Sequence, residues 1–286
     1  MATLKQIRLR IRTAKNIQQI TRAMKLVAAA RLKKATDRVL EARPYSEKLK
    51  ELMQSMSGAG ELPSHPLMEK RPVKKYAVVL ITAERGLAGS YNTNMIRRAT
   101  EFLRDTPGEA SLVTVGKKGQ QFLARRGYRV AHSVTVPSAG ARLQDAVEVT
   151  AKVRQMYESG EVDAVFICYS KFYSPIRQVP QVVQLLPIEP PPAADGHADS
   201  QSMSFEPSPE ALLGTLLPRY LQGLVWQAML EATASEHGSR MTAMTSATDN
   251  AGKMISNLTL KANRERQAGI TKEILEVVSG AEALTA

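Results

Sequence analysis

Ser239 to Gly280 reads SRMTAMTSATDNAGKMISNLTLKANRERQAGITKEILEVVSG. Its apolar residues recur at spacings of three and four, which places on one helix face Met244, Ala247, Ala251, Met254, Leu258 and Ala262. No proline follows Pro218. The run from Arg219 to Val278 therefore predicts a single helix of about 90 Å, at ~1.5 Å per residue. Ordinary globular helices have about three or four turns, so a helix this long requires a partner.

The other end of the chain offers that partner. Apolar residues step by three or four through Leu4, Ile7, Ile11, Ala14, Ile17, Ile20, Met24, Ala28, Leu32, Ala35, Val39 and Ala42. The stripe is first interrupted at Pro44 and resumes as far as Met56. A stripe this narrow and long is typical of a coiled-coil seam. We therefore expect segments 1–58 and 210–286 to form an antiparallel coiled coil.

Residues 72–186 alternate apolar runs with amphipathic segments. We expect strands at 76–83, 111–116, 130–136 and 162–170, and helices at 93–105, 117–126 and 141–158. Arg177–Leu186 is expected to be an edge strand, because Pro180 cannot donate to a central ladder. The alternation predicts an α/β fold, with a Rossmann-like domain of largely parallel strands inserted into the coiled coil. Six prolines in residues 187–209 indicate a linker.

Positive charge is concentrated at the start of the chain. Of the formal net charge of +12 over 286 residues, +10 lies in residues 1–43, where 12 Lys and Arg face only Asp37 and Glu41. A basic segment favours an anionic surface: nucleic acid, lipid head groups or an acidic protein. Nucleic-acid binders commonly add aromatic stacking residues, and residues 1–44 contain none.

No pattern in the sequence indicates catalysis, a metal or a cofactor. The loop Glu84–Ser90 lies where α/β domains bind phosphates, but it matches neither common glycine-rich nucleotide motif, so we interpret it as a structural turn. Gly116–Gly119 is interpreted in the same way. The four histidines are scattered without ligand spacing. We therefore expect no catalytic, metal-binding or cofactor-binding residues.

The cysteine content and the length of the apolar runs indicate the cellular compartment of the chain. Cys168 is its one cysteine, which fits a reducing compartment and leaves no intramolecular disulfide. The longest apolar runs are far shorter than the ~20 residues that span a bilayer. No signal peptide is recognised. We expect the chain to be cytosolic and soluble by itself.

Three motifs in chain order resemble the gamma subunits of F-type ATP synthases. They are IRLRIRTAKNIQQITRAMKLVAAAR near the start, ERGLAGSYNTN in the middle, and SRMTAMTSATDNA with NRERQAGITKEILEVVSGAEAL near the end. The resemblance covers nearly the whole chain. It departs from the family at Glu84, Ala88 and Ser90, where Asp, Cys and Gly are usual, and at Lys25, where many members have Glu. The redox-regulated insert of plant-type members is absent, so thiol switching is not expected.

The resemblance implies a rotating shaft that makes no bond itself. Its partners would be the alpha and beta subunits of the catalytic ring, the epsilon subunit and the membrane c-ring, with one copy per complex. The chain would then meet the membrane only through the ring, at the cytoplasmic face of the cell membrane. Arg22, Met24 and Lys25 match the segment that faces acidic loops of the catalytic subunits. Arg266, Gln267 and Thr271 match a segment gripped by a catalytic-subunit loop, and Phe205 and Glu206 match the foot that meets the ring and epsilon.

Two other classes of function stay open on the sequence. A free-standing binder of nucleic acid or another anionic surface would use the basic helix, and its affinity would fall steeply and log-linearly with salt. A nucleotide-dependent enzyme would use the middle domain and would show turnover by the isolated chain.

Overall fold

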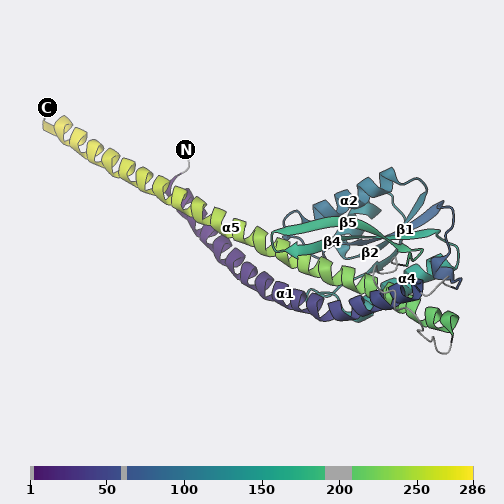
Figure 1. Ribbon diagram of the computed structural model, residues 1–286. Coiled ribbons are helices and arrows are strands. Elements are labelled where there is room, and N and C mark those ends of the chain that lie inside the picture. Colours follow the sequence, from purple (N-terminus) through teal and green to yellow (C-terminus); the bar gives the residue numbers. More distant parts are fainter. Residues whose placement is uncertain (1–2, 59–62, 191–207, 286) are drawn as a thin grey trace. The chain divides into compact units, whose positions relative to one another are not determined.

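The computed structural model describes residues 3–58, 63–190 and 208–285, and it has the predicted α/β fold (Figure 1). Two compact units divide the chain. We call residues 1–27 with 241–286 the rod unit, and residues 28–240 the sheet unit. Each is described by itself.

Two long helices run through both units. Helix α1 spans Leu4–Gly58 and helix α5 spans Pro209–Thr285. Pro44 lies inside α1 and Pro218 inside α5. The predicted helix from Arg219 therefore begins earlier, at Pro209. An interior proline loses one backbone hydrogen bond, but the helix can continue where its other contacts hold it.

The sheet unit contains five strands in the order β3-β2-β1-β4-β5. These are β1 (Lys75–Ile81), β2 (Glu109–Val115), β3 (Val130–Val134), β4 (Ala164–Ser174) and β5 (Arg177–Leu186). The first four are mutually parallel where they pair, and β5 pairs antiparallel with β4 at the edge. Pro180 lies opposite Ser170 in that edge strand, as its missing N–H predicts.

Helices cover both faces of the sheet. On one face, Tyr76, Val78 and Leu80 pack with α2 (Tyr91–Asp105) and α3 (Lys117–Ala124). On the other, Ala77 and Val79 pack with α4 (Leu143–Glu158), the short 3-10 helix η1 (Pro66–Met68) and the sheet-unit parts of α1 and α5. Both faces of β1 are buried, which explains its continuous apolar run.

The buried positions of α1 include a seven-residue repeat: Ile7, Ala14, Thr21, Ala28, Ala35, Leu49 and Met56, with Ala42 half-buried. In the sheet unit Leu32 and Met53 are buried as well. The prediction was wrong at Ile17 and Ile20, which are 48% and 59% exposed. Spacings of three and four do not fix the phase of a stripe over many turns, whereas a seven-residue repeat keeps a supercoiled seam facing its partner. Gln18, which is half-buried, and Thr21 occupy the seam there instead.

The rod-unit part of α5 shows the matching repeat. Met244 and Ala251 are buried, and Leu258 and Glu265 are half-buried at the next two positions. Met254, which we expected in the seam, is 56% exposed, and the half-buried Ile255 replaces it. The Thr248 hydroxyl lies 2.9 Å from that of Thr21. A Cβ added at Gly252 would contact Gln18, so the two helices run antiparallel in this unit.

Candidate functional site

The first candidate surface lies on α1 in the rod unit. Because Thr21 is buried in the seam, Arg22 points outward and is exposed, while Met24 and Lys25 are half-buried beside the seam. The three residues implied by the resemblance therefore lie within one helical turn. A flexible, uncharged Met between two cations gives this turn a surface without deep interlocking groups.

Positive charge dominates the surface of α1. The rod-unit part of the helix carries Lys5, Arg8, Arg10, Arg12, Lys15, Arg22 and Lys25. Within residues 3–58, 63–190 and 208–285, none of these cations has a carboxylate within ion-pair distance. Their field is not neutralised by the described part of the chain, so this surface is suited to acidic partners.

The second candidate surface lies toward the end of α5. Arg266, Gln267 and Thr271 are all exposed, and the Thr271 hydroxyl donates to the backbone oxygen of Gln267 at 3.0 Å. About 27 Å of helix separates Arg266 from Thr248, the residue opposite Thr21, at ~1.5 Å per residue. The structure thus brings each implied set together but keeps the two sets well apart along one rod.

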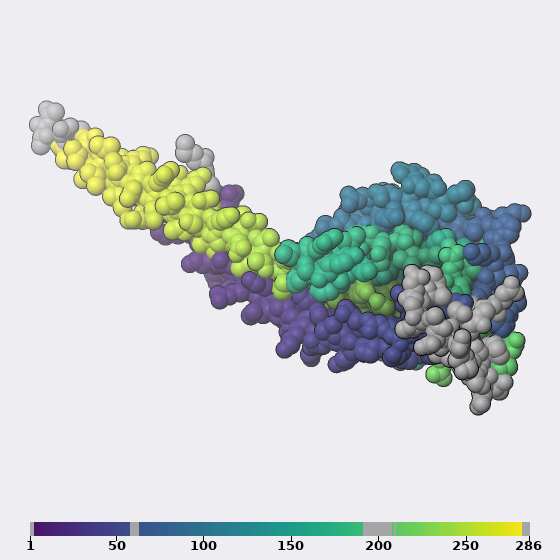
Figure 2. All heavy atoms as spheres, in the orientation of Figure 1, coloured from purple at the N-terminus to yellow at the C-terminus, as the bar shows by residue number. Residues whose placement is uncertain are grey.

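Among residues 3–58, 63–190 and 208–285, no helix lies beside the end of α5. Pairing with α1 ends near Glu265, and every residue from 266 to 281 is exposed. This stretch nevertheless carries large apolar side chains: Ile270, Ile274, Leu275, Val277 and Val278. In Figure 2 the last yellow turns extend past the purple atoms of α1. We call these five residues the bare apolar end. The sequence motifs do not single them out, although their spacing of four and three is visible in the sequence.

The implied foot residues, Phe205 and Glu206, lie outside the described residues.

The glycine-containing loop Glu84–Ser90 is held by contacts within the sheet unit. The backbone N–H of Val136 donates to Glu84 Oε1 at 2.9 Å, and that of Ala83 donates to Asn92 Oδ1 at 2.9 Å. Arg240 Nη2 donates to the oxygen of Gly86 at 3.4 Å. The loop is therefore a structural turn, as predicted.

Gly116–Gly119 is also a packing turn. Gly116 has a φ of +89°, and a Cβ there would lie 2.1 Å from the oxygen of Thr82. The Gly119 N–H donates to Thr82 Oγ1 at 2.9 Å. These contacts bring α3 close to the end of β1, so the glycines serve close approach of the backbone.

Helix α5 fills the place where this fold commonly binds nucleotides. Doubly wound sheets bind ligands at the carboxyl ends of the strands, where the strand order reverses, which here is between β1 and β4. At that edge the Ser235 hydroxyl donates to the oxygen of Ser170 at 2.9 Å, and Arg240 reaches the loop after β1. A nucleotide would have to displace α5, which argues against the nucleotide-dependent enzyme.

A buried polar cluster on α5 accompanies this contact. Glu236 and Arg240 form an ion pair of 2.6 Å, and Arg240 Nη1 lies 3.3 Å from Nδ1 of the buried His237. Burial raises the pKa of Glu236, although Arg240 opposes the shift. Burial, helped by Arg240 and Arg31, lowers the pKa of His237 to about 4. Since Arg donates only, Nδ1 is the acceptor and His237 is neutral at pH 7.

The described residues also bear on metal sites and membrane spans. No group of three or more His, Cys, Asp or Glu in this part of the chain is arranged to hold a metal ion. Nor does any helix within it combine the length and apolar character required to cross a bilayer. Cys168 is buried, and burial raises the pKa of its thiol to about 12.

Comparison with known proteins agrees with the geometry. A family model described as ATP synthase matches residues 3–284. The ATP synthase gamma chain of Moorella thermoacetica is 49% identical over 284 residues, which are 99% of this chain and 100% of that protein. A chain of the Euglena gracilis mitochondrial ATP synthase (OSCP/F1/c-ring) superposes with a TM-score of 0.72 at 20% identity, covering 98% of this chain and 94% of its own.

A chain of the Tetrahymena thermophila mitochondrial ATP synthase central stalk and c-ring superposes with a TM-score of 0.61 at 24% identity, over 80% of this chain and 99% of its own. At these identities the solved structures support the fold, and the sequence relatives support the family. Because the family match spans nearly all of the sequence and curated relatives approach half identity, this chain belongs to the ATP synthase gamma chain family.

Proposed function

We propose that this chain is the central rotor shaft of a proton-translocating F-type ATP synthase and that it catalyses no reaction itself. It couples proton flow through a membrane ring to conformational change in a ring of catalytic subunits. Its partners are the alpha and beta subunits, the epsilon subunit and the c-ring, with one shaft per complex. The family relationship supports this assignment.

The observation that carries the proposal is the bare apolar end. Burying an apolar side chain removes it from water at roughly 25 cal/mol per Å². No helix in the part of the chain that the structure describes covers Ile270, Ile274 or Val277, which are 44%, 57% and 72% exposed. Contiguous apolar exposure of this kind marks a surface that another protein covers. A sleeve of catalytic subunits around the end of the shaft is that cover.

The basic face of α1 supplies the second contact. Arg22 and Lys25 face acidic loops of the catalytic subunits, and Met24 passes between them. A shaft has to slip past its sleeve, so each contact must be weak enough to break at every step. Differences in contact energy among rotor angles bias the catalytic subunits toward different conformations. This coupling needs an asymmetric rod but no catalytic residue in it.

The resemblance also supplies the contact with the membrane ring. Phe205 and Glu206, in the segment between β5 and α5, belong to the foot that meets the c-ring and the epsilon subunit. The chain therefore lies peripherally at the cytoplasmic face of the cell membrane. We also propose that the chain has four segments: 1–58, 72–186, 187–209 and 210–286. The foot belongs to the third segment, the proline-rich linker.

Reconstitution with the catalytic subunits tests the proposal. Replacing Arg266 and Gln267 with Ala should lower multisite ATP hydrolysis while leaving assembly largely intact, because both residues are exposed in the isolated chain. Arg154 and Gln155 provide a matched control, since they form the same exposed pair on α4. Alanine at those two positions should leave hydrolysis unchanged. Equal turnover by both variants would remove Arg266 and Gln267 from the partner surface.

A further inference from the structure

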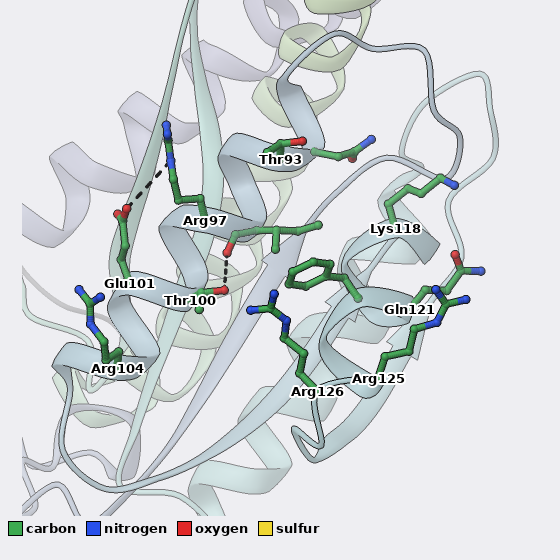
Figure 3. A pocket seen from close by; sticks show the side chains of 12 residues that line it. Thr93, Arg97, Thr100, Glu101, Arg104, Lys118, Gln121, Arg125 and Arg126 are labelled. Carbon is green, nitrogen blue, oxygen red and sulfur yellow. Dashed lines mark hydrogen bonds and ion pairs between the residues drawn. The ribbon is translucent and has the colours of Figure 1, made fainter.

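A groove lies between α2 and α3 on the face of the sheet unit away from α4. Its volume is about 830 Å³ (Figure 3). It runs along α2 from Asn92 to Arg104, which is about 18 Å of helix at ~1.5 Å per residue. None of its lining residues belongs to the surfaces assigned to the rotor above.

The groove joins an apolar centre to a basic rim. Ile96 of α2 and Phe122 of α3 are both half-buried lining residues. Around them stand five cations, Arg97, Arg104, Lys118, Arg125 and Arg126, against one carboxylate, Glu101. The groove therefore carries a formal charge of +4.

Internal ion pairs neutralise only the α2 side of this rim. Arg97 lies 4.0 Å from Glu101, and Arg104 pairs with Asp105 at 2.9 Å. On the α3 side, Lys118, Arg125 and Arg126 have no carboxylate partner among the residues that the structure describes. Three cations concentrated on one wall attract an anionic partner.

Arg126 is held in place for such a partner. Its guanidinium carbon lies 4.3 Å from the centre of the Phe122 ring. Figure 3 shows the Arg126 side chain reaching into the space between the two helices. A guanidinium that lies over a ring can still use its N–H donors, whose fork geometry matches a carboxylate. The ring thus reduces the conformational freedom that Arg126 would lose on binding.

Size and polarity select the class of ligand. A free inorganic anion would fill a small part of a groove this long and would gain nothing from Ile96 or Phe122. A helix with an apolar face can place that face in a groove between two helices, with its flanking side chains on the rims. We propose that this groove binds an acidic amphipathic segment of a partner protein, with an apolar side chain on Ile96 and Phe122 and carboxylates on Lys118, Arg125 and Arg126.

Selection from peptide libraries tests the proposal with the full-length chain as bait. Two displayed libraries of about 12 residues, a length that spans ~18 Å as a helix, share their apolar positions. One carries Asp and Glu at the variable charged positions, and the other carries Lys and Arg. The acidic library should be enriched and the basic one should not.

Charge reversal then locates the binding. Arg125→Glu with Arg126→Glu should weaken binding of a selected acidic peptide, measured by fluorescence anisotropy, at least about tenfold, because like charges meet across the interface. Arg154→Glu with Arg219→Glu changes the net charge equally at two exposed positions outside the groove, and should leave affinity within about twofold. Lys118→Glu should weaken binding by itself.

Three results would overturn the proposal. The first is equal enrichment of the two libraries. The second is an affinity that both double variants reduce alike. The third is displacement of the peptide by ATP or inorganic phosphate, which would assign the groove to a small anion. Each of these results leaves the rotor assignment intact, because that assignment rests on other residues.

Discussion

The same helix, α5, has two different environments along its length. In the sheet unit, the stretch from Ala228 to His237 is almost wholly buried against the sheet and α1. In the rod unit, only Met244 and Ala251 are buried between residues 241 and 281. The first stretch is enclosed by its own chain, and the second presents most of its surface outward. We infer that the sheet unit carries the stability of the molecule and that the rod unit carries its contacts with other subunits.

The seam of the rod unit is correspondingly thin. On α1 its buried residues are Ile7, Ala14 and Thr21, of which one is large and one is polar. Small residues let two helices approach closely but remove little apolar surface from water. Local opening of this unit should therefore cost less free energy than opening of the sheet unit.

The largest expected effect tests this difference in burial. Leu221 on α5 is fully buried in the sheet unit, so Leu221→Ala should lower the free energy of unfolding by roughly 2–5 kcal/mol. Denaturant unfolding monitored by hydrogen exchange in peptides from β1 and β4 measures the loss.

Ile20→Ala is the contrasting change, because Ile20 is 59% exposed. It should alter stability by no more than about 0.5 kcal/mol. Equal effects of the two substitutions would contradict the difference in burial between the sheet unit and the rod unit.

The next effect concerns pH and the buried cluster of the sheet unit. His237 has a folded pKa of about 4, whereas an unfolded His titrates near 6.5. Between these values the unfolded chain binds the proton and the folded chain does not, so stability is lost as pH falls from about 6.5 to about 4. The loss from this group is up to about 3 kcal/mol at 1.36 kcal/mol per pH unit. Arg240, Arg31 and Glu236 face this imidazole or influence it.

Glu236 should partly offset that loss. Its raised pKa means that the folded state takes up a proton first as pH falls, which adds stability in acid. Unfolding free energies measured from pH 7 to pH 4 should therefore show a flatter dependence for His237→Gln and a steeper one for Glu236→Gln. Parallel curves for wild type and both variants would exclude this cluster as the source of the pH dependence.

Substitution of Met24 should change the stability of the chain little. It should clearly impair the coupling between ATP hydrolysis and proton pumping. Met24→Lys adds a cation beside Arg22 and Lys25, where we propose that acidic loops pass. A charge-assisted hydrogen bond contributes about 1.5–3 kcal/mol. If the contact is lost at the barrier, escape from that rotor angle slows by roughly ten- to hundredfold.

The measurement is the ratio of ATP-driven proton pumping to ATP hydrolysis in membrane vesicles. Ala23→Lys is the matched control, because it adds the same charge to the neighbouring exposed position. Coupling should fall with Lys at position 24 more than at position 23. Unchanged rates and an unchanged ratio of pumping to hydrolysis would mean that Met24 does not face acidic loops.

The sequence predicted the sheet unit well and the phase of the rod less well. Apolar runs located the strands because both faces of β1 are covered, and Pro180 identified the edge strand. Ile17, Ile20 and Met254 were misplaced because large apolar side chains can lie on the outer face of a rod that other subunits enclose. A strict seven-residue count would have selected Thr21 instead.

Other features depend on tertiary contacts that local patterns do not contain. Ser235 and Arg240 reach residues of β4 and of the loop after β1 that are far away in sequence, so the filling of the nucleotide crevice was not predictable. The same holds for the basic groove, because Arg104 and Arg126 belong to different helices. The bare apolar end was readable from its spacing, but its exposure within the described part of the chain is known only from the structure.

The smallest expected effect tests the seam of the rod unit itself. The Thr248 hydroxyl lies 2.9 Å from Thr21 Oγ1 and 2.8 Å from the oxygen of Met244, and the Thr21 hydroxyl donates to the oxygen of Gln18 at 3.1 Å. Thr21→Val keeps the shape but removes the acceptor, so it should cost about 0.5–1.5 kcal/mol. Thr21→Val with Thr248→Val replaces both polar partners and should recover most of that loss. Hydrogen exchange of peptides from residues 10–25 reads the local free energy for a double-mutant cycle. A positive coupling means that this hydroxyl pair fixes the register of the two helices, whereas purely additive losses would leave the register to Ile7, Ala14 and Met244 alone.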